Sequence, residues 1–190
     1  GANNTIYRDG SASAKVASVF IPKTLEKIGD TCFYNCSDLN TVAFEEDSRL
    51  SEIGWRAFQG SGIVELNLPS RLANVGSVKY YRHSGSYDDE NSGKYATDYS
   101  GSTLVEKYED RVVNSTSTGV VFTNCDKLER VSFTSNVSVL GDESFSGCSK
   151  LESVTGLDGF SIESFGKGMF EGCSSLSAIE CPSTLTTIRS

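Results

Sequence analysis

A short motif, F-x-x-C-x-x-L, recurs along this chain and constrains its fold more than any other feature. Copies begin at Phe33, Phe122, Phe145 and Phe170, and a copy with serine in place of cysteine begins at Phe58. Neighbouring copies are 23 to 25 residues apart, with one longer interval. Internal repeats of this period indicate a solenoid, in which each repeat forms one turn and packs on its neighbours.

Each repeat begins with the pattern L-x-x-V-x-F or a variant, as in residues 39–44 and 128–133. Apolar and polar residues alternate there, which predicts a half-buried strand. A second apolar pair leads to a glycine, as in residues 25–29, and the phenylalanine motif follows. Its Phe, Cys and Leu would share one face of a short helical turn. The predicted fold is a leucine-rich repeat solenoid of the α/β class, rich in β-structure.

One interval between repeats is much longer than the others. Repeats 1 to 6 begin at residues 16, 39, 63, 128, 151 and 176, so repeat 3 spans 65 residues. The excess, roughly residues 77–118, is an insertion that holds six of the eight tyrosines and the only histidine. We expect it to form a projecting β-hairpin, because a structureless loop of this length is unusual. Residues 1–15 are assigned to a lead-in or partial repeat, and residues 16–190 to a single repeat domain.

Composition narrows the function classes. The net charge of −8 argues against a nucleic-acid partner, which selects basic surfaces. No apolar run reaches the ~20 residues of a membrane-spanning helix, so we expect no direct membrane insertion by this segment. With His83 as the only histidine, and no nucleophile–base pair, phosphate-binding loop or metal-ligand pattern, the sequence predicts no enzyme and no cofactor or metal.

The six cysteines leave two alternatives open. Four of them, Cys36, Cys125, Cys148 and Cys173, take the same place in the motif. We interpret these as core thiols, because a small apolar side chain suits that place. The alternative is at least one disulfide, for which Cys148 and Cys173 are the favoured pair, since stacked repeats bring them within bonding range.

The motif set resembles the BspA-type leucine-rich repeat family. Residues 21–39 follow the family signature almost throughout, with Cys32 in the place of its alanine, and residues 144–151 and 169–176 are equally similar. The resemblance implies a right-handed solenoid with a parallel, concave sheet. It also implies an extracellular or cell-surface protein that adheres to a host or neighbouring-cell surface protein or glycan. The insertion has no counterpart in the signature.

Two groups of residues are candidates for ligand binding. One comprises the outward positions of the predicted strands, which would form a shallow polar face in two columns. The first column is Ser18, Thr41, Glu65, Arg130, Ser153 and Ala178, and the second is Phe20, Ala43, Asn67, Ser132, Thr155 and Glu180. The polar candidates among them are Thr41, Glu65, Asn67, Arg130, Ser132 and Thr155. The alternative is a solvated sheet that binds nothing.

The second group is the inserted tyrosines, because tyrosine offers a large contact area at low entropy cost. They are Tyr80, Tyr81, Tyr87, Tyr95, Tyr99 and Tyr108. The alternative is that several of them pack the insertion onto the solenoid. Residues 88–91 offer clustered oxygens to Ca²⁺, but without the spacing of a calcium loop they are interpreted as a solvated acidic tip. Trp55 is interpreted as a packing residue.

The repeat pattern and the composition predict a non-catalytic binding protein, and the resemblance to the BspA-type family implies that it acts at the cell surface or in the extracellular space. The alternative is a structural spacer or scaffold with no ligand of its own.

Overall fold

In this computed structural model, the described residues are 15–76, 120–134 and 136–189. The chain divides into two compact units, one made of Gly1–Val78 with Ser117–Ser190 and the other of Lys79–Thr116. All described residues belong to the first unit. The lead-in before residue 15 and the expected β-hairpin of the insertion lie outside the described residues.

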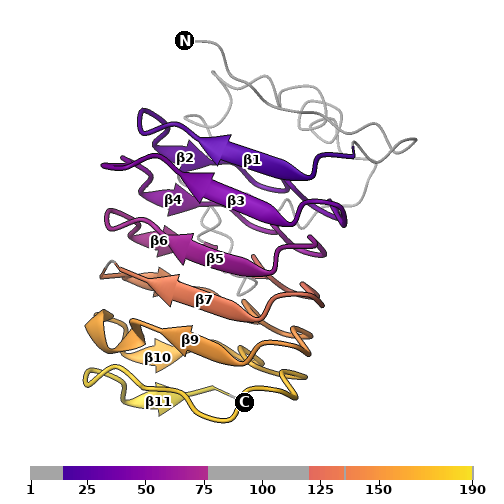
Figure 1. Cartoon of the computed structure of the whole chain (residues 1–190). Coiled ribbons are helices and arrows are strands. Elements are labelled where there is room, and N and C mark those ends of the chain that lie inside the picture. Colours follow the sequence, from indigo (N-terminus) through magenta and orange to yellow (C-terminus); the bar gives the residue numbers. More distant parts are fainter. Residues whose placement is uncertain (1–14, 77–119, 135, 190) are drawn as a thin grey trace, which may run out of the picture. The chain divides into compact units, whose positions relative to one another are not determined.

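The first unit is a solenoid whose longer strands form one parallel sheet (Figure 1). Its strands come from successive repeats and pair in sequence order: β1 (Ser18–Ile21), β3 (Thr41–Phe44), β5 (Glu65–Leu68), β7 (Arg130–Phe133) and β9 (Ser153–Thr155). The second residue of β3, β5, β7 and β9, such as Leu66 or Val131, is buried, and the residues flanking it are more exposed. The equivalent Val19 in β1 is partly buried. The predicted leucine-rich repeat solenoid and its half-buried strands are therefore confirmed.

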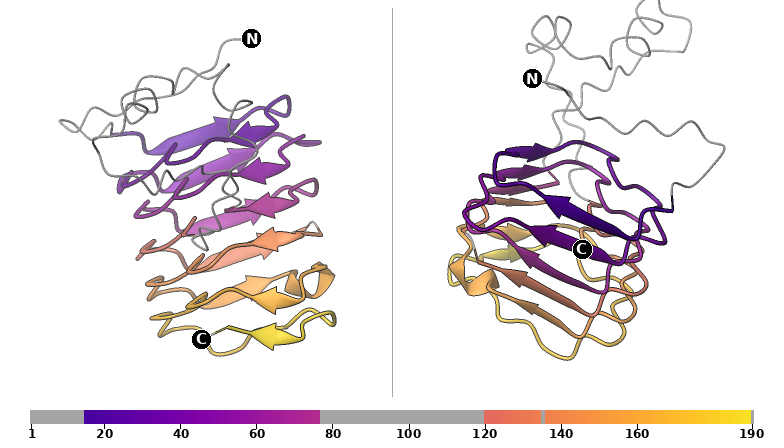
Figure 2. Two further views of the ribbon diagram at one scale, coloured as in Figure 1. Left: turned by 180° about the vertical axis from the view of Figure 1, so that it is seen from behind. Right: turned by 45° about the horizontal axis from the view of Figure 1, so that its top comes forward.

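Shorter strands form a second parallel ladder on another side of each turn (Figure 2). They are β2 (Lys27–Ile28), β4 (Glu52–Ile53), β6 (Asn74–Val75) and β8 (Val139–Leu140), and a further pair is β10 (Ser164–Phe165) with β11 (Thr187–Ile188). A single turn of 3₁₀ helix, η2 (Leu157–Gly159), follows β9. The segments that the sequence predicted only as extended are thus hydrogen-bonded strands.

The phenylalanine motif closes each turn, and it does not form the helical turn that we expected. Tyr34 N–H donates to the Thr31 carbonyl at 3.2 Å, and Cys36 N–H donates to the Phe33 carbonyl at 3.2 Å, so the segment consists of tight turns. Thr31 and Asn35 have φ of 53°, and a residue in the left-handed region interrupts a right-handed helix. The same segment instead bonds to the next repeat, with Phe33 N–H donating to the Ala57 carbonyl at 2.7 Å.

The core confirms that the repeats stack in register across the insertion. The phenylalanines of the motif form one column, with consecutive ring centroids 5.2 to 5.8 Å apart and rings inclined by 2° to 12°. Phe58 stacks on Phe122 at 5.8 Å although 64 positions separate them in the sequence. The column of phenylalanines is therefore continuous from Phe58 to Phe122, while the expected insertion itself, roughly residues 77–118, lies outside the described residues.

The cysteines of the motif form a second column, and all six cysteines of the chain are free. Cys125 and Cys148 are fully buried. The Cys148 thiol donates to the Phe122 carbonyl of the preceding repeat at 3.0 Å, and the Cys173 thiol donates to the Phe145 carbonyl at 3.0 Å. The interpretation as core thiols is confirmed for these positions, and the Cys148–Cys173 disulfide considered as the alternative is not formed.

Repeat 6 departs from the predicted pattern. In the described part of the chain, the five-stranded sheet ends at β9, and residues 176–180 are not in a strand. The last strand of this sheet, β9, ends at Thr155, and Gly156 follows with φ of 81°. Ala178 and Glu180, expected at the ends of the two outward columns, therefore do not extend the sheet.

Candidate binding surface

The outward side chains of the five-stranded sheet, here called the long-strand face, form the candidate surface predicted from the sequence. Strand pairing places Thr41 beside Glu65 and Glu65 beside Arg130. The same register places Asn67 beside Ser132 and Ser132 beside Thr155. All six polar candidates therefore lie on one face, in two adjacent columns, because parallel strands in register align equivalent positions.

An ion pair occupies the middle of the long-strand face. Arg130 Nη2 lies 3.1 Å from Glu65 Oε2, and Arg130 Nη1 lies 3.6 Å from Glu129 Oε2. Asn67 Nδ2 donates to Glu65 Oε1 at 3.5 Å. Both partners of the main pair are about half exposed, so solvent screens it and it contributes only ~0–1 kcal/mol to stability. The pair sets local charge and side-chain orientation rather than holding the fold together.

Hydroxyl groups and one aromatic ring complete this face. Thr155 Oγ1 donates to Ser132 Oγ at 3.1 Å, and Thr41 Oγ1 donates to Asn40 Oδ1 at 2.8 Å. Phe20, on the outermost strand β1, is 64% exposed. The face is thus shallow and polar, with an apolar side chain at one edge and many of its polar groups already bonded to each other.

The other sequence candidates lie outside the described residues. These are the six inserted tyrosines and the acidic residues 88–91. Within the ranges that the structure describes, no group of three or more His, Cys, Asp or Glu side chains is arranged to hold a metal ion.

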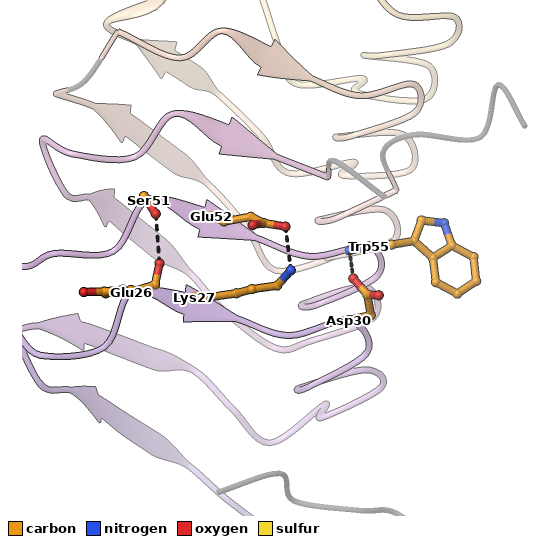
Figure 3. Close-up of polar contacts among 6 residues, drawn as sticks. All are labelled: Glu26, Lys27, Asp30, Ser51, Glu52 and Trp55. Carbon is orange, nitrogen blue, oxygen red and sulfur yellow. Dashed lines mark hydrogen bonds and ion pairs between the residues drawn. The ribbon is translucent and has the colours of Figure 1, made fainter. Parts of the chain in front are cut away.

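The outer side of the short-strand sheet carries its own cross-repeat bonds (Figure 3). Lys27 Nζ lies 2.7 Å from Glu52 Oε1, and Ser51 Oγ donates to the Glu26 carbonyl at 3.1 Å. These contacts tie repeat 1 to repeat 2 along this face. In these contacts the side chains bond to the neighbouring repeat, and they do not gather into a binding site.

Asp30 bonds across the same two repeats, beside the glycine that ends β2. Its Oδ1 accepts a hydrogen bond from the Trp55 backbone N–H at 2.8 Å. Burial raises the pKa of the Asp30 carboxyl above its ordinary value, although the bond to Trp55 acts in the opposite direction. Asp142 repeats the arrangement, accepting from the Lys167 N–H at 3.0 Å.

Sequence reasoning missed a cluster on the turn side of the solenoid. The Arg56 guanidinium carbon lies 4.1 Å from the centroid of the Trp55 ring and 5.9 Å from that of the Tyr34 ring. Figure 3 shows the Trp55 side chain pointing away from the strands. Trp55 is half-buried rather than enclosed, so the expectation of a packing residue was incomplete. Alignment of repeats 1 and 2 on Phe33 and Phe58 matches Tyr34 with Gln59 and not with Arg56, so the sequence carries no direct signal for this contact.

Comparison with known proteins gives a family match. A family model described as "BspA type Leucine rich repeat region" matches six copies, over residues 4–88 and 117–190. The comparison with curated proteins found no match. Among the described residues, no helix combines the length and apolar character that a bilayer crossing requires.

Two solved structures are similar to the chain. One is a leucine-rich repeat protein from Bacteroides ovatus ATCC 8483, with 23% identity and a TM-score of 0.47 over 92% of this chain and 43% of the other. The other is the pneumococcal vaccine antigen PcpA, with 16% identity and a TM-score of 0.37 over 89% of this chain and 51% of the other. The chain thus spans about half the length, or less, of the solved structures it matches.

Proposed function

Because this chain belongs to the BspA type leucine-rich repeat family, we propose that it is a non-catalytic binding module that recognises a protein or glycan through its long-strand face. Leucine-rich repeat families are typically non-catalytic, and solenoids generally present extended surfaces. The proposed setting is the cell surface or extracellular space, as the family resemblance implies. The proposed partner is a surface protein or glycan of a host or neighbouring cell.

The observation that carries this proposal is the register of the five-stranded sheet. Five repeats that are far apart in sequence each contribute side chains to one continuous face. The outward side chains differ between neighbouring repeats, as Thr41, Glu65 and Arg130 show, while the buried positions beside them are apolar. Variation confined to the outward positions provides a surface whose chemistry can be specific to one ligand.

A structural spacer is the second candidate, and one observation favours it. Polar groups on the long-strand face bond to one another, as in the Glu65–Arg130 pair at 3.1 Å and the Thr155–Ser132 bond at 3.1 Å. A ligand would have to replace these bonds, which reduces its net gain. A spacer needs no such exchange.

Two matched substitutions separate the candidates. Asn67→Arg places a long cation on the long-strand face, and Asn74→Arg places the same cation on the outward side of the short-strand sheet in the same repeat. Binding of the parent and both variants would be measured on a panel of extracellular matrix proteins and on a glycan array. We expect saturable binding that Asn67→Arg weakens at least tenfold and Asn74→Arg leaves unchanged. Absence of saturable binding by the parent would favour the spacer. Saturable binding that both variants keep equally would contradict recognition through the long-strand face.

A further inference from the structure

Asn136 lies in the connection between β7 and β8, within the triplet Asn136-Val137-Ser138. The triplet Asn-x-Ser/Thr, in which x is not proline, is the acceptor sequence for N-linked glycosylation of exported proteins. Because so short a triplet also arises by chance, a site requires in addition that the fold exposes the asparagine. It also requires that the amide nitrogen can carry a bulky oligosaccharide without disturbing the packing of the repeats.

The connection between β7 and β8 exposes the amide of Asn136. Asn136 and Ser138 are exposed, whereas Val137 between them is fully buried and fixes this segment to the core. Asn136 Oδ1 accepts a hydrogen bond from Ser161 Oγ of the next repeat at 2.8 Å. No group among the described residues accepts a bond from Asn136 Nδ2, which is the atom that becomes glycosylated. The oxygen of this amide is therefore held by the fold, and its nitrogen is available.

The place that Asn136 occupies is exposed in every repeat. It directly precedes the apolar residue that leads into the short strand, as Asn136 precedes Val137. Arginines hold this place in repeats 2 and 3 and are exposed there, so the column accommodates long side chains. The complete column is Thr24, Arg49, Arg71, Asn136, Ser161 and Thr184, and all six residues are exposed. A substituent on Asn136 would leave the surface as those arginine side chains do.

A second triplet within the described ranges, Asn35-Cys36-Ser37, has different surroundings. It belongs to the phenylalanine motif, and Asn35 has φ of 53° in a tight turn. A Cβ added at Gly60 of the next repeat would overlap Asn35 Oδ1, so this amide lies against the neighbouring turn. An oligosaccharide on Asn35 would crowd the stacked turns. The two triplets match the same acceptor sequence but differ in the room around the amide.

We propose that Asn136 is an acceptor for an N-linked oligosaccharide and that Asn35 is not. Asn136 Nδ2 forms a bond to the anomeric carbon of an oligosaccharide that is carried on a polyprenyl diphosphate. The bond between that carbon and the diphosphate breaks, the diphosphate leaves, and the amide loses one proton to a base of the transferase. This inference rests on the extracellular setting proposed above, because such transferases act on exported chains. Asn136 lies beyond the last residue of β7, so the attachment point is outside the long-strand face.

Site-specific mass spectrometry tests the proposal. The full chain would be produced behind a secretion signal in insect cells, and the secreted protein would be digested to peptides. Treatment with peptide N-glycosidase F in heavy-oxygen water converts each glycosylated asparagine to a labelled aspartate. We expect the label at Asn136 and none at Asn35. Asn136→Gln should abolish the glycan on this peptide, and Ser138→Thr, which preserves the acceptor triplet, should retain it.

An unmodified Asn136 in the secreted protein, or a label at Asn35, would overturn the proposal. Both results come from the parent protein, so they do not depend on whether a variant folds. The readout also uses no ligand, which separates it from the proposed function. An unmodified Asn136 in a protein that binds through its long-strand face would overturn this inference alone. A glycosylated Asn136 in a protein without saturable binding would support this inference and favour the spacer.

Discussion

At the scale of single residues, neighbouring repeats are matched by complementary small and large side chains. Asn35, Gly60, Asn124, Gly147 and Gly172 occupy one place in successive turns, and all have positive φ. A Cβ added at Gly60 would overlap Asn35 Oδ1, and one added at Gly147 would overlap Asn124 Oδ1. An asparagine in one repeat therefore requires a glycine in the next. Sequence inspection showed the Asn or Gly at this place but not the reason for the alternation.

Substitution of these glycines should reveal the matching. Gly60→Ala combines strained backbone at φ of 67° with a clash against Asn35, whereas Gly172→Ala at φ of 74° meets only ordinary contacts, the nearest at 3.5 Å. We expect both to destabilise the fold by ~1–2 kcal/mol through the backbone, and Gly60→Ala to cost more. Urea denaturation of the two variants tests this. In the double variant, Asn35→Gly should remove the extra loss of stability that Gly60→Ala shows relative to Gly172→Ala. If the stability effects of Asn35→Gly and Gly60→Ala simply add, the proposed clash between Asn35 and residue 60 is wrong.

Asp30 gives a prediction about pH. Its folded-state pKa is raised by burial, so its ionised form destabilises the fold relative to the unfolded chain. Stability from this group therefore increases as pH falls through its folded pKa, and levels off below the unfolded value of ~3.9. An asparagine side chain at this position would accept the same bond from Trp55 without a charge. We expect Asp30→Asn to be at least as stable as the parent at pH 7, with the difference shrinking toward pH 4 in urea denaturation. An Asp30→Asn variant that is less stable than the parent at pH 7 but not at pH 4 would contradict this prediction, because the ionised Asp30 carboxylate would then stabilise the fold.

At the scale of elements, the sequence predicted the strands well and the turns poorly. Alternation in residues 39–44 and 128–133 specifies a half-buried strand because one face packs on the core. The tight turns were mistaken for helix because non-glycine residues, such as Thr31, Arg56 and Glu143, hold the left-handed conformation there. That conformation is imposed by hydrogen bonds to the next repeat, which no local pattern reveals. The contact between Arg56 and Tyr34 was missed for the same reason, because the two residues meet only across repeats.

The thiol column predicts a clear order of reactivity. Cys125 and Cys148 are fully buried, whereas Cys181 is exposed. A side-chain hydrogen bond to Cys125, together with burial, raises the pKa of the Cys148 thiol. Burial also raises the pKa of the Cys173 thiol. The reactive form is the thiolate, so an aromatic disulfide reagent should label Cys181 first in the native protein. Cys125 and Cys148 should react only on unfolding. Rapid native labelling of Cys148, read by peptide mass spectrometry, would contradict the buried column.

At the scale of the whole solenoid, each repeat is stabilised by the neighbour on either side. Its stability is therefore close to a sum of repeat and interface terms. Phe122 is fully buried between Phe58 and Phe145, whereas Phe170 stacks on Phe145 and is only half-buried. The sequence predicted this column. It could not reveal that residues 176–180 of repeat 6 form no strand.

The two phenylalanines provide a matched test of that dependence on neighbours. We expect Phe122→Ala to destabilise the fold by ~3–5 kcal/mol, the range for a fully buried phenylalanine. Phe170→Ala should cost clearly less, because its ring loses fewer contacts. Urea denaturation of both variants measures the difference. Equal losses of stability in the two variants would contradict the expectation that a phenylalanine at the end of the column contributes less than one inside it.

The contact between Phe58 and Phe122 tests the central claim most directly, because it depends on register across the insertion. Nuclear Overhauser effects between ring protons would be measured in the full chain with selectively labelled phenylalanine. The account predicts contacts in the order Phe33, Phe58, Phe122, Phe145 and Phe170, including the Phe58–Phe122 contact at a centroid separation of 5.8 Å. A spectrum with the other contacts but without that one would contradict a continuous solenoid.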